Sequence, residues 1–257
     1  MSLAILATVR RSWDADAGVY LNAVEQADSK QLEPAVAQAI NQFVLGCKAD
    51  GVWSAIKASC ILMGARTLSG ALTSLVGTEP TNNNFVSGDY NRKTGLLGNG
   101  STKYLNSNRN NNADPQNSKH ISIYSTAAGS GGISIGCGAV SDTGRSVIAR
   151  VPGSSSHAAR IHNSVASSFG DATGTGFIGA SRSSSANFVA RMNGTNTTLT
   201  QTSETPQNEN IGVLARTTGA SYCAERISFY SIGESLTLSS LDSRLTTLYN
   251  AIGAAIA

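Results

Sequence analysis

The stretch Ile227–Tyr249, ISFYSIGESLTLSSLDSRLTTLY, changes from the pattern of a strand to the pattern of a helix within a few residues. Its first part alternates: Ile227 and Phe229 fall on one face of an extended chain, and Tyr230 and Ile232 fall on the other. Because both faces carry apolar side chains, this pattern predicts a strand that is covered on both sides.

The second part of the stretch has the period of a helix. Leu241, Leu245, Leu248 and Ile252 recur at three- and four-residue steps, and Ser239-x-x-Asp242 has the spacing of a capping box at a helix start. A helix with such a stripe buries its leucines against the rest of the chain. We therefore expect a short C-terminal helix that closes a β domain.

Upstream of this ending, from Lys119 onward, short alternating runs follow one another between clusters of Gly and Ser. The runs expected to be strands are ISIYS, GGISIGCGAV, RSVIARV, GFIGAS, ANFVARM, NTTLTQT, NIGVLART and ERISFYSI. Many strands at intervals of about 8–12 residues, without helical patterns between them, are typical of an antiparallel sandwich or jelly roll. The fold class predicted here is mainly β.

One turn in this region is well defined by its sequence. Asn193-Gly194 lies between two alternating runs in FVARMNGTNTTL, and both central positions of a type I′ turn require a positive φ, which Asn and Gly accept most easily. The runs on either side are therefore expected to pair as a hairpin.

The first third of the chain has a different pattern. Apolar residues recur with helical spacing in residues 14–28, 32–51 and 51–65, the last through Val52, Ile56, Cys60 and Met63. These segments predict a compact helical subdomain. We place an N-terminal arm and this subdomain in residues 1–77, and the β domain in residues 78–257. The arm, SLAILATV, is expected either to pair with a neighbouring subunit's sheet edge or to lie on its own chain.

Composition argues against several classes of function. Charged residues make up 14% of the chain and the net charge is +3, so no basic stripe for nucleic acid is present. The apolar N-terminal run is too short to span a bilayer, and we expect no membrane partner. The four cysteines are far apart and lie in apolar or small-residue runs, which indicates buried reduced thiols and assembly in a reducing cytoplasm.

Three motifs resemble a known family when taken in order along the chain. GLLGNGSTKYLNSN resembles the strand that opens laminin-G-like, concanavalin A-like jelly rolls, and FVARMNGT resembles the hairpin late in those domains. AERISFYSIGESLTLSSLDSRLTTLY resembles their closing strand and helix. The resemblance covers residues 85–249 and implies a concanavalin A-like jelly roll, preceded here by the helical subdomain.

A second resemblance spans nearly the whole chain. The order of DADAGVYLNAVEQAD, FVLGCKADGVWSAIKASCILMGARTLSGAL and FVSGDYNRKTGLLGNGSTKYLNSN is similar to structural proteins of tailed bacteriophages. In that family a small helical segment precedes a concanavalin A-like domain. The resemblance implies a virion protein assembled in the host cytoplasm, either as head decoration or as a component of the tail, fibre or baseplate.

No catalytic constellation is evident in the sequence. Glucanases of the concanavalin A-like class resemble one another in an E-x-D-x-E strand, which is missing here, and the acids of the β region are scattered. His157 and His162 are five residues apart and point to opposite faces of a strand, so they do not suit a shared metal. Asp114 in an Asn-rich loop is a thin basis for a calcium site. We expect no catalytic residue, metal or cofactor.

The candidate contacts are therefore those of binding and assembly. The tyrosines of the β region are the candidate platforms for glycan rings: Tyr90, Tyr104, Tyr124 and Tyr222. Apolar residues of the helical region are the candidates for docking onto a particle: Phe43, Trp53 and Ile56. The leading hypothesis is a non-enzymatic, homo-oligomeric virion protein that contacts other virion proteins. The alternatives are a receptor-binding module for host surface glycans and a glycan-cleaving enzyme.

Overall fold

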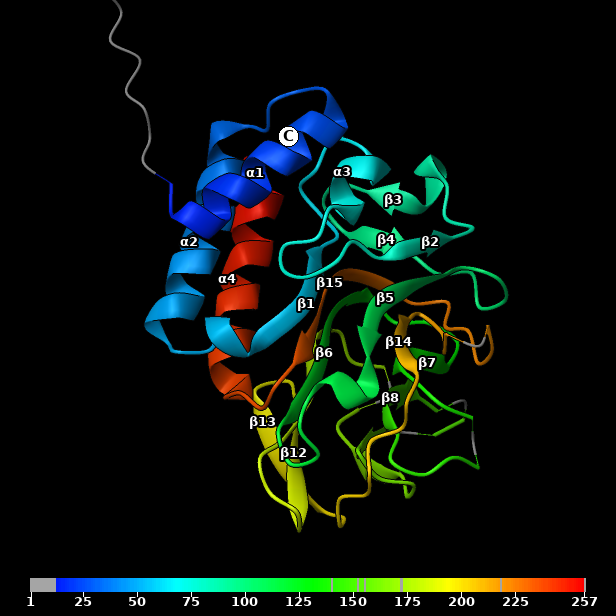
Figure 1. The fold of residues 1–257 in the computed structure, drawn as a ribbon. Helices are drawn as coiled ribbons and strands as arrows, with labels where there is room; N and C mark the ends of the chain where they lie inside the picture. Colours follow the sequence, from blue (N-terminus) through cyan, green and yellow to red (C-terminus); the bar gives the residue numbers. More distant parts are fainter. Residues whose placement is uncertain are drawn as a thin grey trace, which may run out of the picture.

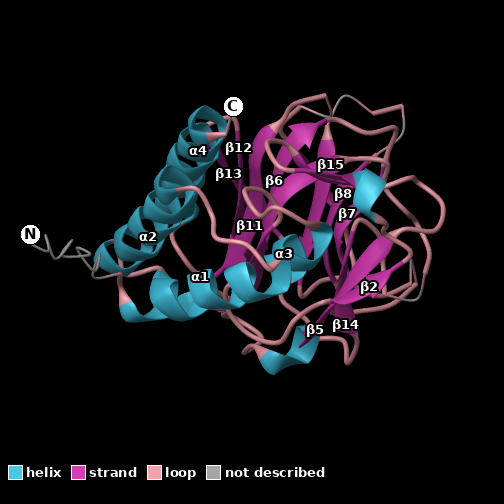
Figure 2. Cartoon of the chain, turned by 90° about the horizontal axis from the view of Figure 1, so that it is seen from above, coloured by secondary structure: helices cyan, strands magenta, loops and turns pink. Residues whose placement is uncertain are grey.

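The computed structural model describes residues 13–139, 141–151, 153–154, 156–171, 173–217 and 219–256 of the 257-residue chain. The predicted arm lies outside these residues. Two antiparallel sheets stack on each other, and a layer of helices covers the outer face of one of them (Figures 1 and 2). This confirms the predicted antiparallel β-sandwich with helices at both ends.

The eight-stranded sheet runs in the order β13-β12-β11-β6-β15-β4-β3, and β1 also pairs with β15. Its strands are β1 (Ile56–Ile61), β3 (Tyr90–Asn91), β4 (Gly95–Leu97), β6 (Lys119–Ala127), β11 (Gly176–Arg182), β12 (Asn187–Met192), β13 (Thr195–Thr200) and β15 (Arg226–Gly233). The predicted hairpin is confirmed: Met192 pairs with Thr195, and Asn193 and Gly194 have φ values of 49° and 74°.

The seven-stranded sheet runs in the order β10-β9-β8-β7-β14-β5-β2. Its strands are β2 (Thr81–Asn83), β5 (Tyr104–Asn110), β7 (Gly132–Gly136), β8 (Ser146–Arg150), β9 (His157–Ile161), β10 (Ser167–Phe169) and β14 (Asn210–Val213). The side chains between the two sheets form one apolar core, which includes Ile123, Ile135, Ile148 and Val213.

The helix layer consists of α1 (Ala15–Asp28), α2 (Pro34–Ala49) and α4 (Leu238–Ala255), with the short α3 (Leu68–Leu72) beside it. Asp14 caps α1 by accepting hydrogen bonds from the N–H groups of Asp16 and Ala17, and Pro34 occupies the first turn of α2.

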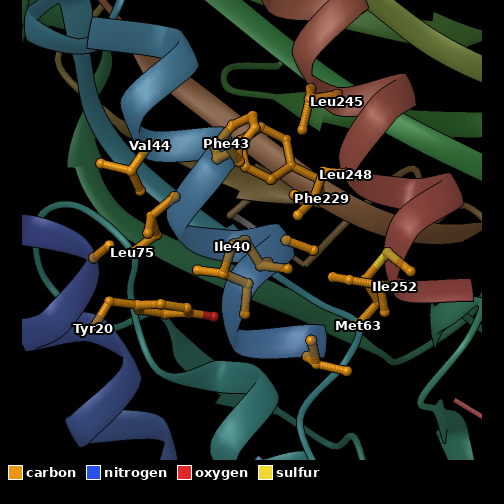
Figure 3. Packing of buried hydrophobic residues seen from close by; sticks show 14 of the residues in the cluster. Tyr20, Ile40, Phe43, Val44, Met63, Leu75, Phe229, Leu245, Leu248 and Ile252 are labelled. Carbon is orange, nitrogen blue, oxygen red and sulfur yellow. The ribbon is translucent and has the colours of Figure 1, made fainter. Parts of the chain in front are cut away.

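A second apolar core lies between the helices and the eight-stranded sheet. Phe43 of α2 contacts Phe229 of β15 edge to face, with ring centroids 5.8 Å apart (Figure 3). The predicted α4 stripe is buried in this core: Leu241, Leu245, Leu248 and Ile252. The helix therefore closes the domain as expected, although its N-cap is Thr237 and makes no side-chain cap, so the predicted Ser239–Asp242 capping box is wrong.

The predicted helix over residues 51–65 is also wrong. A 3₁₀ turn at Trp53–Ala55 leads into β1, which pairs with β15. Ile56 and Ile61 face the helices, while Ala58 and Cys60 face the other sheet. A strand with apolar residues on both faces matches a helical stripe by chance, because such a run fits either period.

The alternation predicted for β15 is interrupted at one point. The register shifts between Ile227 and Phe229, so Ile227 lies in the core between the sheets and Phe229 lies under the helices. The carbonyl oxygen of Ser228, at the bulge, accepts a hydrogen bond from the N–H of Leu62 at 2.8 Å. A β-bulge of this kind moves the following side chains to the opposite face.

Candidate functional site

A pocket of about 400 Å³ opens on the outer face of the seven-stranded sheet, on the side away from the helices. On β8, Ile148 points into the core between the sheets, so its neighbours Val147 and Ala149 point outward into the pocket. On β9 the same alternation places Arg160 on the outer face. The volume is within the range of about 300–1,000 Å³ that is usual for small-ligand sites.

One rim of the pocket is the segment that follows β14. Leu214 has a φ of 66°, after which Arg216 bridges to Gly136 of β7, and the N–H of Ile133 donates to the Ser221 carbonyl oxygen at 2.8 Å. Gly132 permits this approach: a Cβ there would lie 2.1 Å from the Tyr222 carbonyl oxygen. The segment is therefore held against β7 with Tyr222 beside the opening.

Two of the four predicted tyrosines meet at this rim. The rings of Tyr104 and Tyr222 pack edge to face with centroids 6.1 Å apart, and the Tyr104 hydroxyl donates to the Thr217 carbonyl oxygen at 3.2 Å. Both side chains are half-buried. Tyr104 thus supports Tyr222, which is among the residues that line the pocket.

The other two predicted tyrosines lie elsewhere. The Tyr90 hydroxyl donates to the Ala65 carbonyl oxygen at 2.7 Å, beneath α3. Tyr124 is buried against α4, where its ring stacks on Tyr249 with centroids 5.1 Å apart. Neither ring lines the pocket, because each serves packing between the eight-stranded sheet and the helical region.

The pocket is lined by four arginines: Arg145, Arg150, Arg160 and Arg216. Arg145 Nη2 and Arg160 Nε both donate to the Ser164 carbonyl oxygen, at 3.0 and 2.9 Å. Arg216 Nη1 donates to the Gly138 carbonyl oxygen at 2.9 Å. Backbone carbonyls thus hold these guanidinium groups in place.

The fourth arginine is paired with a carboxylate below the pocket. Arg150 Nη2 lies 2.6 Å from Glu225 Oε1, and both side chains are buried. Glu225 also accepts hydrogen bonds from the hydroxyls of Ser125 and Ser134, each at 2.6 Å. Since Ser125 is on β6 and Ser134 is on β7, this carboxylate links the two sheets directly beneath the site.

Burial changes the pKa of two of the pocket arginines, Arg145 and Arg160. Burial lowers the pKa of Arg160 to about 10, with a further contribution from the charge of Arg145. Burial also lowers the pKa of Arg145, although the nearby Asp142 carboxylate opposes this shift. Because a pKa of about 10 is well above neutral pH, the Arg160 guanidinium is protonated there.

The predicted docking residues lie on α2, in the turn before β1 and at the start of β1. Phe43 and Ile56 are buried in the core under the helices. Trp53 is half-buried, and its indole N–H donates to Asp16 Oδ2 at 3.0 Å. The first two therefore support the fold, and Trp53 is the one that reaches the surface.

Other residues that the sequence singled out have structural roles. Asp114 is buried between Arg109 and Lys119, with Lys119 Nζ 2.6 Å from Asp114 Oδ2. The four cysteines are buried and free, as predicted. Across the described ranges, no group of three or more His, Cys, Asp or Glu side chains could hold a metal ion. No described helix is long and apolar enough to cross a membrane.

The pocket arginines are not predicted from the sequence. Arg145 is the first residue of RSVIARV, Arg150 is its last but one, and Arg160 lies in the next strand. The sequence does show that these arginines lie in or beside short apolar strands. Because side chains alternate along a strand, the pattern could have predicted on which face of the sheet each arginine lies. Arg216 joins them only because β14 lies beside β7.

No protein-family model matches the sequence, and no curated protein matches it. Among solved structures, the binding domain of botulinum neurotoxin serotype D is 10% identical, with a TM-score of 0.47, over 75% of this chain and 51% of that one. Botulinum neurotoxin type C, which depends on interaction with two ganglioside molecules to enter cells, is 12% identical, with a TM-score of 0.49, over 76% of this chain and 51% of that one.

A sialidase of Trypanosoma rangeli, in complex with a difluorosialic acid as a covalent intermediate, is 10% identical, with a TM-score of 0.47. The match covers 83% of this chain and 39% of the sialidase. The chain thus spans about half the length of the neurotoxin structures it matches. Likeness at this level carries no information about ligand or activity.

Proposed function

We propose that this chain is a non-enzymatic carbohydrate-binding module and that the pocket on its seven-stranded sheet is the binding site. The observation that carries the proposal is the pocket itself, with the Tyr222 ring at its rim and fixed guanidinium donors around it. Sugar recognition needs an aromatic face for the ring and polar donors for its oxygens. Tyr222, Arg145 and Arg160 supply both within one site of about 400 Å³.

Binding without cleavage is part of the proposal. The carboxylate that is paired with a pocket arginine is that of Glu225, which is buried and already accepts hydrogen bonds from Arg150, Ser125 and Ser134. The Cys223 thiol is a fourth donor, 3.7 Å from Glu225 Oε2, and a carboxylate held in this way suits a structural role. When an oligosaccharide that binds the protein is incubated with it, mass spectrometry should detect no cleavage product; release of a shorter sugar would contradict this part.

We also propose, from the sequence resemblance, that the module is a homo-oligomeric component of a tailed-phage particle that displays the sandwich on its surface and binds host glycans. The layered fold supports this orientation, because α1, α2 and α4 lie on the opposite side of the molecule from β7 and β8 (Figure 2), and β7 and β8 carry residues that line the pocket. The helical side can thus contact other virion proteins while the pocket faces outward.

The binding proposal is tested with the full chain on an array of bacterial surface oligosaccharides. We expect selective binding that Tyr222→Ala weakens by about tenfold or more, because a stacked aromatic is lost. Tyr249→Ala is the matched control, since that half-buried tyrosine lies on α4. Binding by neither the original chain nor the control, with both folded by circular dichroism, would refute the proposal.

The virion proposal has a separate test. Particles purified from infected cells and freed of loose protein are digested and analysed by mass spectrometry. Peptides of this chain at many copies per particle are expected. Their absence from intact particles would end the virion proposal and leave the binding proposal unaffected.

A further inference from the structure

Three arginines of the pocket carry charges that no described carboxylate neutralises by contact. Arg150 is paired with Glu225, but within the described ranges no Asp or Glu oxygen lies within 4.0 Å of the guanidinium of Arg145, Arg160 or Arg216. Each of these three is held instead by a neutral backbone carbonyl. The pocket therefore concentrates positive charge in a chain that is otherwise only weakly basic.

Acids around the pocket are occupied by other donors. Asp142 accepts from the Gln207 amide at 2.7 Å, and Glu204 accepts from the N–H of Gly144 at 2.6 Å and the Ser164 hydroxyl at 2.7 Å. The charges of Asp142 and Glu204 do reach Arg145, but neither acid forms an ion pair with it. Their oxygens shape the loops around the pocket rather than cap its arginines.

The arginines also retain unused donors. Arg145 is only 4% exposed, yet its Nε has no acceptor among the described residues, and the same is true of Nε of Arg216. Arg150 also has Nε and Nη1 without an acceptor in the described part of the chain, but this side chain lies below the pocket in its pair with Glu225. Buried donors without partners are costly to a fold, so the free Nε groups of Arg145 and Arg216 are suited to a ligand that brings acceptor oxygens.

We propose that the ligand is an acidic sugar, and that Arg145, Arg160 and Arg216 receive its carboxylate while Tyr222 packs against the sugar ring. This inference rests on the proposed carbohydrate-binding function and names the ligand class for the same site. A carboxylate is planar and presents two oxygens, which match the fork of a guanidinium group in a bidentate pair. The hexuronic and nonulosonic acids both carry such a group on a pyranose ring.

The experiment uses an array that carries oligosaccharides of hexuronic and nonulosonic acids beside the same compounds with the carboxyl reduced to an alcohol. Sulfated oligosaccharides and a single-stranded DNA oligonucleotide are the further arms. We expect the full chain to bind the carboxylated compounds about tenfold or more tightly than the reduced ones, because a charged hydrogen-bond pair is lost on reduction. Tighter binding of the sulfated sugar or of the oligonucleotide would overturn the choice of ligand.

Variants then assign the effect to the pocket by isothermal titration with the carboxylated oligosaccharide that binds most tightly on the array. Arg145→Gln, Arg160→Gln and Arg216→Gln should each weaken its binding by about tenfold or more, and each should weaken the binding of the carboxyl-reduced form by a smaller factor, because only the acidic sugar loses a charged pair. Arg244→Gln is the matched control, because it removes the same charge from the surface of α4, where Arg244 pairs with Asp50. Equal effects of Arg160→Gln and Arg244→Gln would overturn the proposal.

A conservative variant keeps the test valid if a glutamine variant fails to fold. Arg160→Lys keeps the charge and loses the planar fork, so it should restore only part of the affinity for the carboxylated sugar. If the carboxyl-reduced sugars bind as tightly as the acidic ones and Tyr222→Ala weakens both, the acidic-sugar inference fails while the carbohydrate-binding function stands. If no sugar binds to the folded chain, both fail together.

Discussion

Arg150 and Glu225 form a buried ion pair, 2.6 Å from Nη2 to Oε1, beneath a pocket whose other arginines have no carboxylate in contact among the described residues. Because Glu225 also binds a serine from each sheet, the pair fixes the position of β8 and β7 relative to the sheet behind them. The paired arginine thus supports the fold, and the unpaired ones line the pocket where we propose that the ligand binds.

The first prediction concerns this pair. Glu225→Gln leaves the Arg150 charge buried without its partner, and we expect the free energy of unfolding to fall by about 3–5 kcal/mol. Urea unfolding at pH 7 measures the change. Glu234→Gln is the control, since its pair with Lys57 is half-exposed and should contribute less than about 1 kcal/mol. Similar losses from both variants would contradict the role assigned to Glu225.

A second prediction concerns Gly132, whose lack of a side chain lets the segment with Tyr222 pack against β7. Gly132→Ala combines a φ of +126° with a Cβ that would meet the Tyr222 carbonyl oxygen, so we expect the rim to shift and sugar binding to be lost. Gly176→Ala is the matched control: its φ is +92°, but no atom lies within 4 Å of the added Cβ. Both variants should lose stability in urea unfolding, whereas titration with the sugar should show lost affinity in the Gly132 variant alone.

A third prediction follows from the closing helix. Leu245→Ala removes a side chain that lies between α4 and the eight-stranded sheet and is 2% exposed (Figure 3), and it should cost about 2–5 kcal/mol of unfolding free energy. Leu45→Ala changes the same residue type on α2, where the side chain is 40% exposed. We expect a loss within about 0.5 kcal/mol for that control. Comparable losses would mean that α4 does not close the domain.

A fourth prediction concerns acid. His120, His157 and His162 are buried, and burial lowers the pKa of each to about 4. An unfolded histidine has a pKa of about 6.5, so the unfolded chain binds more protons between pH 6.5 and pH 4. The free energy of unfolding should therefore fall as the pH falls through this window, by about 1 kcal/mol or more per histidine between pH 7 and pH 5.

His157 allows this to be checked at one position. Its ring packs on Phe169 with centroids 5.8 Å apart, so His157→Phe keeps an aromatic ring there and removes one titrating group. Urea unfolding of this variant between pH 7 and pH 5 should show a shallower decline than the original chain. An unchanged decline would show that His157 is not protonated on unfolding in this range.

The sequence predicts well those features whose local pattern fits only one kind of structure. Asn193-Gly194 fixes the hairpin because few other residues tolerate a positive φ at both turn positions, and the α4 leucine stripe has only one helical face. β1 was predicted wrongly because its residues are apolar on both faces, and the bulge at Ser228 leaves no local signal. A tertiary contact decides each case: β1 forms because it pairs with β15, and the bulge forms where β15 pairs with β6.

The site could be predicted only in part. The sequence picks out Tyr104 and Tyr222 as aromatic platforms, and the structure brings them together at the pocket rim. It does not place Arg160 beside Arg145, since that contact depends on β8 and β9 being adjacent and on both side chains reaching the Ser164 carbonyl. The order of the strands in the sheet decides which candidate residues come together in a site, and short sequence motifs do not encode that order.

The most direct test of the account is a crystal structure of the full chain in complex with the acidic oligosaccharide that binds most tightly on the array. We predict that its carboxylate lies within hydrogen-bond distance of the guanidinium groups of Arg145 and Arg160, with a sugar ring against Tyr222. A sugar bound at another surface, with these three side chains free of it, would contradict the account.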